Sequence, residues 1–207
     1  MEAMPTMIDM RVCELLAARL CHDMAGPIAA VANGAELLGD DDPDFAREAA
    51  TLIGDSARTA AKRLQLFRYI FGFSRGAHAG PPPHALASEY FAGSAIECDY
   101  PDAVRELEPA WQRLACGLLF IGADGLPRGG RLILDLTVDG LTLTGAGLGD
   151  GLPMESRDAL TRIIPVAELT SRSVCAYFAG LLAEGLGQRL VLTAEPGRFR
   201  IKCEAGA

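Results

Sequence analysis

The chain has 207 residues, half of them hydrophobic, and a formal net charge of -8 with a pI of about 4.9. This length allows one ordinary domain or two small ones, and the composition allows a real core. The negative charge argues against nucleic-acid or anionic-membrane partners, which select clustered positive charge. No apolar run approaches the roughly 20 residues that cross a bilayer, and no signal-peptide pattern is visible, so we expect a cytoplasmic protein.

The six cysteines are scattered along the chain without a C-x-x-C pair. This spacing suggests neither a zinc site nor a disulfide framework. It favours free, mostly buried thiols in a reducing compartment. We therefore expect no intrinsic metal.

Residues 7–73 carry a helical pattern in two stretches. Apolar residues recur at steps of three and four from Leu16 to Leu38, and again from Phe45 to Phe71. Between the stretches, Asp42 is placed to cap a helix whose first residue is Pro43. The pattern predicts two long antiparallel helices joined by a short polar turn, an N-terminal hairpin within residues 1–75.

Two helices leave the groove between their apolar stripes open. Packing two such hairpins together would close both grooves in a four-helix bundle. We therefore expect a homodimer, because exposed apolar area favours association. The alternative is that the second half of the same chain covers this surface.

The stretch "SRGAHAGPPPHA" is rich in Gly and Pro and predicts a linker over residues 76–85, with His78 and His84 exposed to solvent. Residues 86–207 then alternate helical and strand patterns. Helices are expected at 86–92, 108–125, 154–163 and 171–186, and strands at 95–100, 131–138, 141–145 and 188–204 with a turn at 195–197. Helices over one antiparallel sheet make this half an α/β sandwich and the whole chain α+β.

His22 is the candidate functional residue of the first helix. It lies two positions from both Leu20 and Met24, about 200° around the helix from each, so it points away from the apolar stripe. Its face holds short or polar residues. Folding the hairpin about its turn places Ala61 beside it, flanked by Arg58 and Lys62. A neutral, exposed imidazole near cations is suited to accept a phosphoryl group.

Two neighbours of this histidine also bear on its chemistry. Helix positions i and i+1 diverge, so Asp23 is not expected to sit beside the ring. It could still act in acid–base chemistry or orient the imidazole, and an ordinary solvated carboxylate is an equal alternative. Pro27 removes the amide that would bond to the carbonyl of Asp23, so we expect a local bend in the helix there.

The stretch "HDMAGPI" resembles the H-box of sensor histidine kinases: His, an acidic residue, three more, Pro and an aliphatic. In that family a two-helix hairpin precedes an ATP-binding domain, which is the order expected here. The ATP-binding boxes are missing. Leu118 and Gly122 stand where the kinases carry asparagines for magnesium and phosphates, and Leu143 stands where they carry the adenine-reading aspartate. The glycines of "TGAGLGDG" could cradle a phosphate, but an ordinary loop is the favoured explanation.

The chain combines an intact phospho-acceptor with a nucleotide site that lacks its binding residues, and in this it resembles the ChpT-type histidine phosphotransferases. The stretches "RLCHDMAGPIAAVANGAELL" and "LPRGG" are also similar to that family. The resemblance implies a dimeric protein of a two-component phosphorelay. In it, His22 would take a phosphoryl group from the receiver domain of a hybrid kinase and pass it to response regulators, while the degenerate domain helps to hold the receiver. The Mg²⁺ would come with the receiver, so no intrinsic cofactor is expected.

Receiver docking on such a hairpin usually pairs apolar residues around the acceptor. The candidates for docking are Met24, Ala25, Ala29, Ala57 and Ala61, and those for charge compensation are Arg19, Arg58 and Lys62. The three cations could equally be ordinary salt-bridge formers. Two other functions stay open: an ATP-dependent histidine kinase with a divergent nucleotide site, and a non-catalytic adaptor that binds response regulators.

Overall fold

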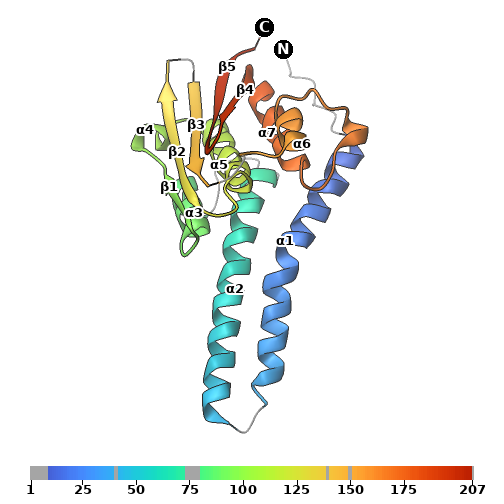
Figure 1. Cartoon of the computed structure of the whole chain (residues 1–207), viewed down its shortest axis with the longest axis vertical. Coiled ribbons are helices and arrows are strands. Elements are labelled where there is room, and N and C mark those ends of the chain that lie inside the picture. Colours follow the sequence, from blue (N-terminus) through green and yellow to red (C-terminus); the bar gives the residue numbers. More distant parts are fainter. Residues whose placement is uncertain (1–8, 40–41, 73–79, 139, 149–150, 207) are drawn as a thin grey trace.

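The computed structural model describes residues 9–39, 42–72, 80–138, 140–148 and 151–206. Two long helices, α1 (Met10–Leu37) and α2 (Pro43–Phe71), lie side by side as the predicted antiparallel hairpin (Figure 1). The predicted cap of α2 is confirmed. The Asp42 side chain accepts a hydrogen bond of 2.9 Å from the backbone N–H of Asp44, and Pro43 occupies the first turn, where its missing N–H costs nothing.

A five-stranded sheet with helices packed on it forms the second half, which makes the chain α+β as predicted. Its strand order is β1-β2-β3-β5-β4, and the inward side chains of the central strands belong to the core. The elements are α3 (Pro83–Phe91), β1 (Ile96–Asp99), α4 (Asp102–Arg105), α5 (Pro109–Asp124), β2 (Gly130–Thr137), β3 (Gly140–Gly147), α6 (Met154–Leu160), the 3-10 turn η1 (Val166–Glu168), α7 (Val174–Gly185), β4 (Gln188–Glu195) and β5 (Arg198–Ala205).

The sheet is mixed, so the expectation of an antiparallel sheet was wrong for one strand. β1 pairs in parallel with β2, and the remaining neighbours are antiparallel. Parallel neighbours need a crossover, which α4 and α5 provide. The short elements α4 and η1 were not predicted, because they have too few residues for a periodic signal.

The helix α3 begins inside the predicted linker, at Pro83 rather than Leu86. His84 is therefore a helical residue. It is half-buried, with its ring centroid 6.3 Å from that of Tyr100, so the expectation that it is solvent-exposed was wrong. Three consecutive prolines indicate a linker from the sequence, but the last of them, Pro83, is the first residue of a helix, a position that proline favours. His78 and the predicted boundary at residues 75 and 76 lie outside the described residues.

The aromatic end of α2 belongs to the core of the second half. Phe67, Tyr69 and Ile70 are buried there, and the Phe71 ring lies 5.2 Å from that of Phe178. Arg113 of α5 fixes this end by donating from Nε to the carbonyl of Ile70 at 2.7 Å. At this end, the second half of the same chain does cover the hairpin, which was the alternative left open.

Along the rest of the hairpin the apolar stripes stay open. Five large stripe residues are between 39% and 58% exposed: Ile28, Leu38, Phe45, Leu52 and Leu64. A groove of about 660 Å³ lies between the two helices toward the aromatic end of α2, and its lining includes Leu16, Leu20, Leu64 and Phe71. A single chain therefore leaves apolar area of the hairpin uncovered.

The length and composition of α1 alone would allow it to cross a membrane, which was not expected from the sequence. Alanines between its larger apolar residues keep the average hydropathy high without an obvious apolar run. The helix nevertheless packs along α2 and carries ion-paired Arg19 and Asp23 near its middle. Its open apolar positions fit a protein interface.

Arg63 of α2 compensates for the proline inside α1. The helix continues through Pro27, whose lack of an N–H leaves the carbonyl of Asp23 without its usual partner. Arg63 donates from Nη1 to this carbonyl at 2.7 Å. A cation of the second helix thus replaces the missing bond and ties the two helices together at the histidine-bearing turn, where the sequence predicted only a bend.

Arg63→Met removes this donor, so we expect the free energy of unfolding to fall by about 1–3 kcal/mol. In a Pro27→Ala background, residue 27 regains an N–H for the carbonyl of Asp23, and the same change should cost about 1 kcal/mol less. Urea unfolding at one fixed protein concentration measures both. Arg47→Met, which breaks only the exposed pair with Asp44, is the matched control and should leave stability nearly unchanged. Equal costs in both backgrounds would contradict this role of Arg63.

Candidate functional site

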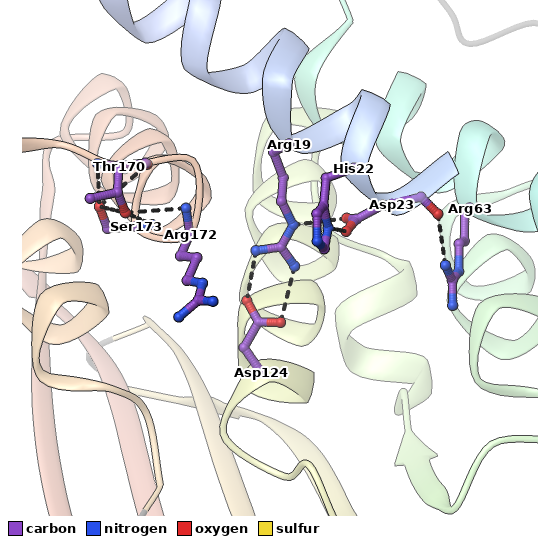
Figure 2. A network of polar contacts seen from close by, with 8 residues as sticks. All are labelled: Arg19, His22, Asp23, Arg63, Asp124, Thr170, Arg172 and Ser173. Carbon is purple, nitrogen blue, oxygen red and sulfur yellow. Dashed lines mark hydrogen bonds and ion pairs between the residues drawn. The ribbon is translucent and has the colours of Figure 1, made fainter. Parts of the chain in front are cut away.

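His22 projects from the middle of α1 toward the second half of the chain (Figure 2). Its side chain is 84% exposed, as its position opposite the apolar stripe predicted. The ring is therefore not a core histidine. A docking protein can reach it without any rearrangement of the hairpin.

Asp23 lies beside this ring, which corrects the expectation that the two side chains diverge. The Oδ1 atom of Asp23 is 3.2 Å from Nδ1 of His22. The Cα–Cβ bonds of adjacent helical residues do point apart, but the imidazole is long enough to reach back to its neighbour. A carboxylate in this place accepts a hydrogen bond from Nδ1–H and so leaves the lone pair on Nε2.

Arg19 joins this pair to the second half of the chain. Its Nε donates to Oδ2 of Asp23 at 2.8 Å. Its Nη2 and Nη1 donate to the two oxygens of Asp124, the last residue of α5, at 3.1 Å and 3.3 Å. The guanidinium also lies 5.5 Å from the centre of the Phe120 ring. A continuous chain of contacts thus runs from Asp124 to the imidazole (Figure 2).

The charges of this network depend on its burial. Burial alone lowers the pKa of Arg19, but the charges and hydrogen bonds of Asp124 and Asp23 outweigh it, so the pKa is raised and the guanidinium stays charged. Burial raises the pKa of Asp124; Arg19 opposes this shift and the negative charge of Asp23 adds to it. Burial also raises the pKa of the nearby Tyr90 to about 12, so its phenol stays neutral. One permanent cation therefore holds two acidic side chains together.

A cavity of about 420 Å³ separates His22 from the second half. Its lining residues are Arg19, His22, Asp23, Asp124, Pro153, Ser156, Ser171 and Arg172. Arg172 is exposed on the wall contributed by the loop before α7 (Figure 2). The hydroxyl of Thr170 shapes this loop by accepting from the backbone N–H of Arg172 at 3.2 Å. Ser171 and Arg172 were missed from the sequence, because only the tertiary fold brings their loop to the histidine.

The structure places the other predicted charge-compensating cations elsewhere. Arg58 pairs with Asp55 on the exposed face of α2, and Lys62 donates from Nζ to the carbonyl of Ala92 at 3.1 Å. Arg63, two residues past the expected position of Ala61, is the α2 residue that contacts the turn of His22. The roles of Arg58 and Lys62 stay predictions.

The predicted docking residues differ in accessibility. Ala25, Ala29, Ala57 and Ala61 are exposed, whereas Met24 is half-buried. Met24 lies with Arg19, Asp23, Arg63 and Asp124 around a second, smaller cavity of about 200 Å³. The exposed alanines leave room for a partner, while packing limits what Met24 can contact.

Apolar packing occupies the positions that would hold a nucleotide by resemblance to the kinases. Leu118 and Leu143 are fully buried, and a Cβ on Gly122 would lie 2.9 Å from the side chains of both Leu132 and Leu143. Gly145 is a residue of β3 rather than of a loop, and a Cβ there would clash with Phe199. These glycines therefore serve close packing.

The acidic and thiol side chains of the chain bear on metal binding and on thiol chemistry. In the described ranges, no group of three or more His, Cys, Asp or Glu side chains comes together as a metal site would require. All six cysteines are free, with Cys13 and Cys21 exposed. Burial raises the pKa of both Cys175 and Cys203 to about 12, so their thiols stay protonated and unreactive. The exposed imidazole of His22 is a nucleophile that a partner can reach.

Comparison with known proteins identifies the family of the chain. The family model of the histidine phosphotransferase C-terminal domain matches residues 83–198. The chain is 32% identical to the protein phosphotransferase ChpT of Brucella abortus (strain 2308) over 188 residues. The aligned region covers 87% of this chain and 88% of that protein. The solved structure of a bacterial phosphotransferase is similar with a TM-score of 0.76 and 28% identity, covering 96% of this chain and 98% of that one. The chain is thus a phosphotransferase, and it belongs to the ChpT-type histidine phosphotransferase family.

Proposed function

We propose that this protein is the histidine phosphotransferase of a multistep two-component phosphorelay in the cytoplasm. His22 takes a phosphoryl group from the receiver domain of a hybrid kinase and delivers it to response regulators. The observation that carries the proposal is the imidazole itself, 84% exposed and held at Nδ1 by the carboxylate of Asp23. This leaves Nε2, on the other side of the ring, for an incoming aspartyl phosphate.

The transfer proceeds by in-line attack. The lone pair of Nε2 forms a bond to phosphorus while the bond from phosphorus to the aspartyl oxygen breaks, and the aspartate leaves with that electron pair. The product is a phosphoimidazolium that keeps its proton on Nδ1, where the carboxylate of Asp23 offsets the new positive charge. The reverse step, onto a second receiver, returns a neutral ring. Mg²⁺ carried by the receiver would shield the charge of the phosphoryl group.

The cavity beside His22 offers a partner one cation besides Arg19, which already pairs with Asp23 and Asp124. Arg172 stands exposed on the opposite wall, where it can meet the acidic pocket of a receiver. On the hairpin, the short side chains of Ala25, Ala29 and Ala61 allow close approach. The second half of the chain thereby helps to hold the receiver. Arg58 and Lys62 are further candidates for contacts on α2.

His22→Ala tests the proposed transfer with a purified phosphorylated receiver and a purified acceptor. We expect acid-labile, base-stable label to disappear from this chain and transfer to the acceptor to fall by at least about 100-fold, because the nucleophile is gone. His84→Gln is the matched control. This histidine belongs to α3 and packs near Tyr100, so the variant should keep the transfer. Unchanged transfer by His22→Ala would instead support a non-catalytic adaptor.

Incubation with labelled ATP distinguishes this function from that of a histidine kinase with a divergent nucleotide site. Leu118, Gly122 and Leu143 offer no polar anchor for the metal, phosphates or adenine, so we propose that ATP alone does not label the chain. Label on His22 from ATP without any partner would favour the kinase alternative.

We also propose that the protein works as a homodimer whose two hairpins form a four-helix bundle. The support is the open stripe of Ile28, Phe45, Leu52 and Leu64 and the apolar groove between the helices. Exposed apolar area of this kind favours association. A bundle would cover the stripes while leaving His22, on the opposite face of α1, accessible.

Leu52→Glu places a charge in the proposed bundle core, so we expect the dimer to dissociate. Sedimentation velocity should give the wild type about twice the chain mass of 21.9 kDa and the variant the mass of one chain. Val138→Glu, at a fully exposed position beyond β2, is the matched control and should stay dimeric. A wild type that sediments as a monomer at all concentrations would contradict the proposal.

A further inference from the structure

We propose that Asp124 of the second half is a positioning residue for the phospho-acceptor, acting on His22 through Arg19 and Asp23. This inference rests on the proposed function and deepens it. It makes the degenerate domain part of the acceptor site as well as a support for the partner.

The first step is the fork between Arg19 and Asp124. Both terminal nitrogens of the guanidinium donate to Asp124, at 3.1 Å and 3.3 Å, each to a different oxygen. A guanidinium is planar, so a two-point contact at one edge also fixes the direction of its Nε–H. The stacking distance of 5.5 Å to the Phe120 ring restrains the same plane. Residues of α5 therefore determine where Nε points.

The second step is the carboxylate of Asp23. Its Oδ2 accepts from Nε of Arg19 at 2.8 Å, which leaves Oδ1 for Nδ1 of His22 at 3.2 Å. The backbone of Asp23 is held in turn by Arg63, and its side chain is only 20% exposed. With one oxygen and the backbone both fixed, the carboxylate has little freedom to rotate. Its other oxygen stays where the ring needs an acceptor.

The third step is the ring. At 84% exposure, the imidazole of His22 has little packing to orient it. The tautomer of a histidine depends on the hydrogen bond that one ring nitrogen makes. Asp23 supplies that bond here, so the position of its Oδ1 decides how often Nδ1 carries the proton and Nε2 the lone pair.

Loss of Asp124 changes this balance in a defined direction. Arg19 stays charged, and Asp23 becomes its remaining carboxylate partner in the network. The guanidinium can then turn and take both oxygens of Asp23, because bidentate pairing with one carboxylate is its preferred geometry. The lone pair of Oδ1 that faced Nδ1 is then turned toward the guanidinium, so the hydrogen bond to the imidazole weakens. Fewer molecules then present Nε2 as the nucleophile.

Histidine-selective ¹⁵N NMR of the full-length protein, without any partner, measures the tautomer directly. The spectra are recorded at about pH 8, where a free imidazole is neutral. In the wild type we expect Nδ1–H to dominate at His22; in Asp124→Ala the balance should shift toward Nε2–H. Asp124→Asn keeps one oxygen acceptor for Arg19 and should lie between them. Asp99→Asn, which removes an ion pair with Arg131 in the sheet, is the matched control and should not change the signal.

Single-turnover transfer from a phosphorylated receiver supplies the kinetic arm. We expect Asp124→Ala to lower the rate at saturating receiver by about 3- to 30-fold, a coupling typical of residues in one network. The receiver concentration at half-saturation should stay within about twofold, because the proposed docking residues Ala25, Ala61 and Arg172 are unchanged. If Asp124→Ala fails to fold by circular dichroism, Asp124→Asn carries both measurements.

Two results would overturn the inference. One is an unchanged tautomer balance at His22 in the Asp124 variants. The other is a change only in the half-saturating receiver concentration, which would make Asp124 a docking residue. A wild-type protein that takes no label at His22 would refute the proposed function instead, and the tautomer measurement on the free protein keeps the two failures apart.

Discussion

The rest of the site depends on the ion pairs that the guanidinium of Arg19 makes with Asp23 and Asp124. A cation whose side chain is only 14% exposed needs carboxylate partners to offset its lost hydration, and Arg19 finds one on each side, Asp23 and Asp124. The two carboxylates belong to different halves of the chain. The contacts around His22 are therefore complete only when the second half is packed against the hairpin, so the chemistry proposed for His22 would depend on the fold of the second half.

The hairpin divides its apolar surface between two kinds of interface. Its aromatic end is buried inside the chain, where Phe67 and Ile70 join the core of the second half. The remaining stripe, with Ile28 and Leu52, is left open and is what the proposed second copy would cover. His22 lies on neither surface. In the proposed dimer, this separation would let one helix contact the second half, join the bundle and leave the imidazole of His22 accessible to other proteins.

Local patterns in the sequence predict most of the helices and strands of the fold. Helical periodicity, the Asp42 cap and strand alternation predict elements because they depend on neighbours along the chain. The same reasoning placed His22 on the exposed face. It could not find Asp124 or Arg172, since their positions beside His22 depend on how distant elements pack. It also missed Arg63, whose role follows from the register between two helices, and the parallel pairing of β1, which depends on a long crossover.

Phosphorus–nitrogen NMR on the phosphorylated protein tests most directly whether Asp23 directs the chemistry of the ring. The protein, labelled with ¹⁵N at histidine, would be charged by a phosphorylated receiver and examined for ³¹P coupling to each ring nitrogen. The predicted result is coupling at Nε2 of His22 with a proton retained on Nδ1, the atom that faces Asp23. Coupling at Nδ1, or a phosphoryl group on any other residue, would contradict it.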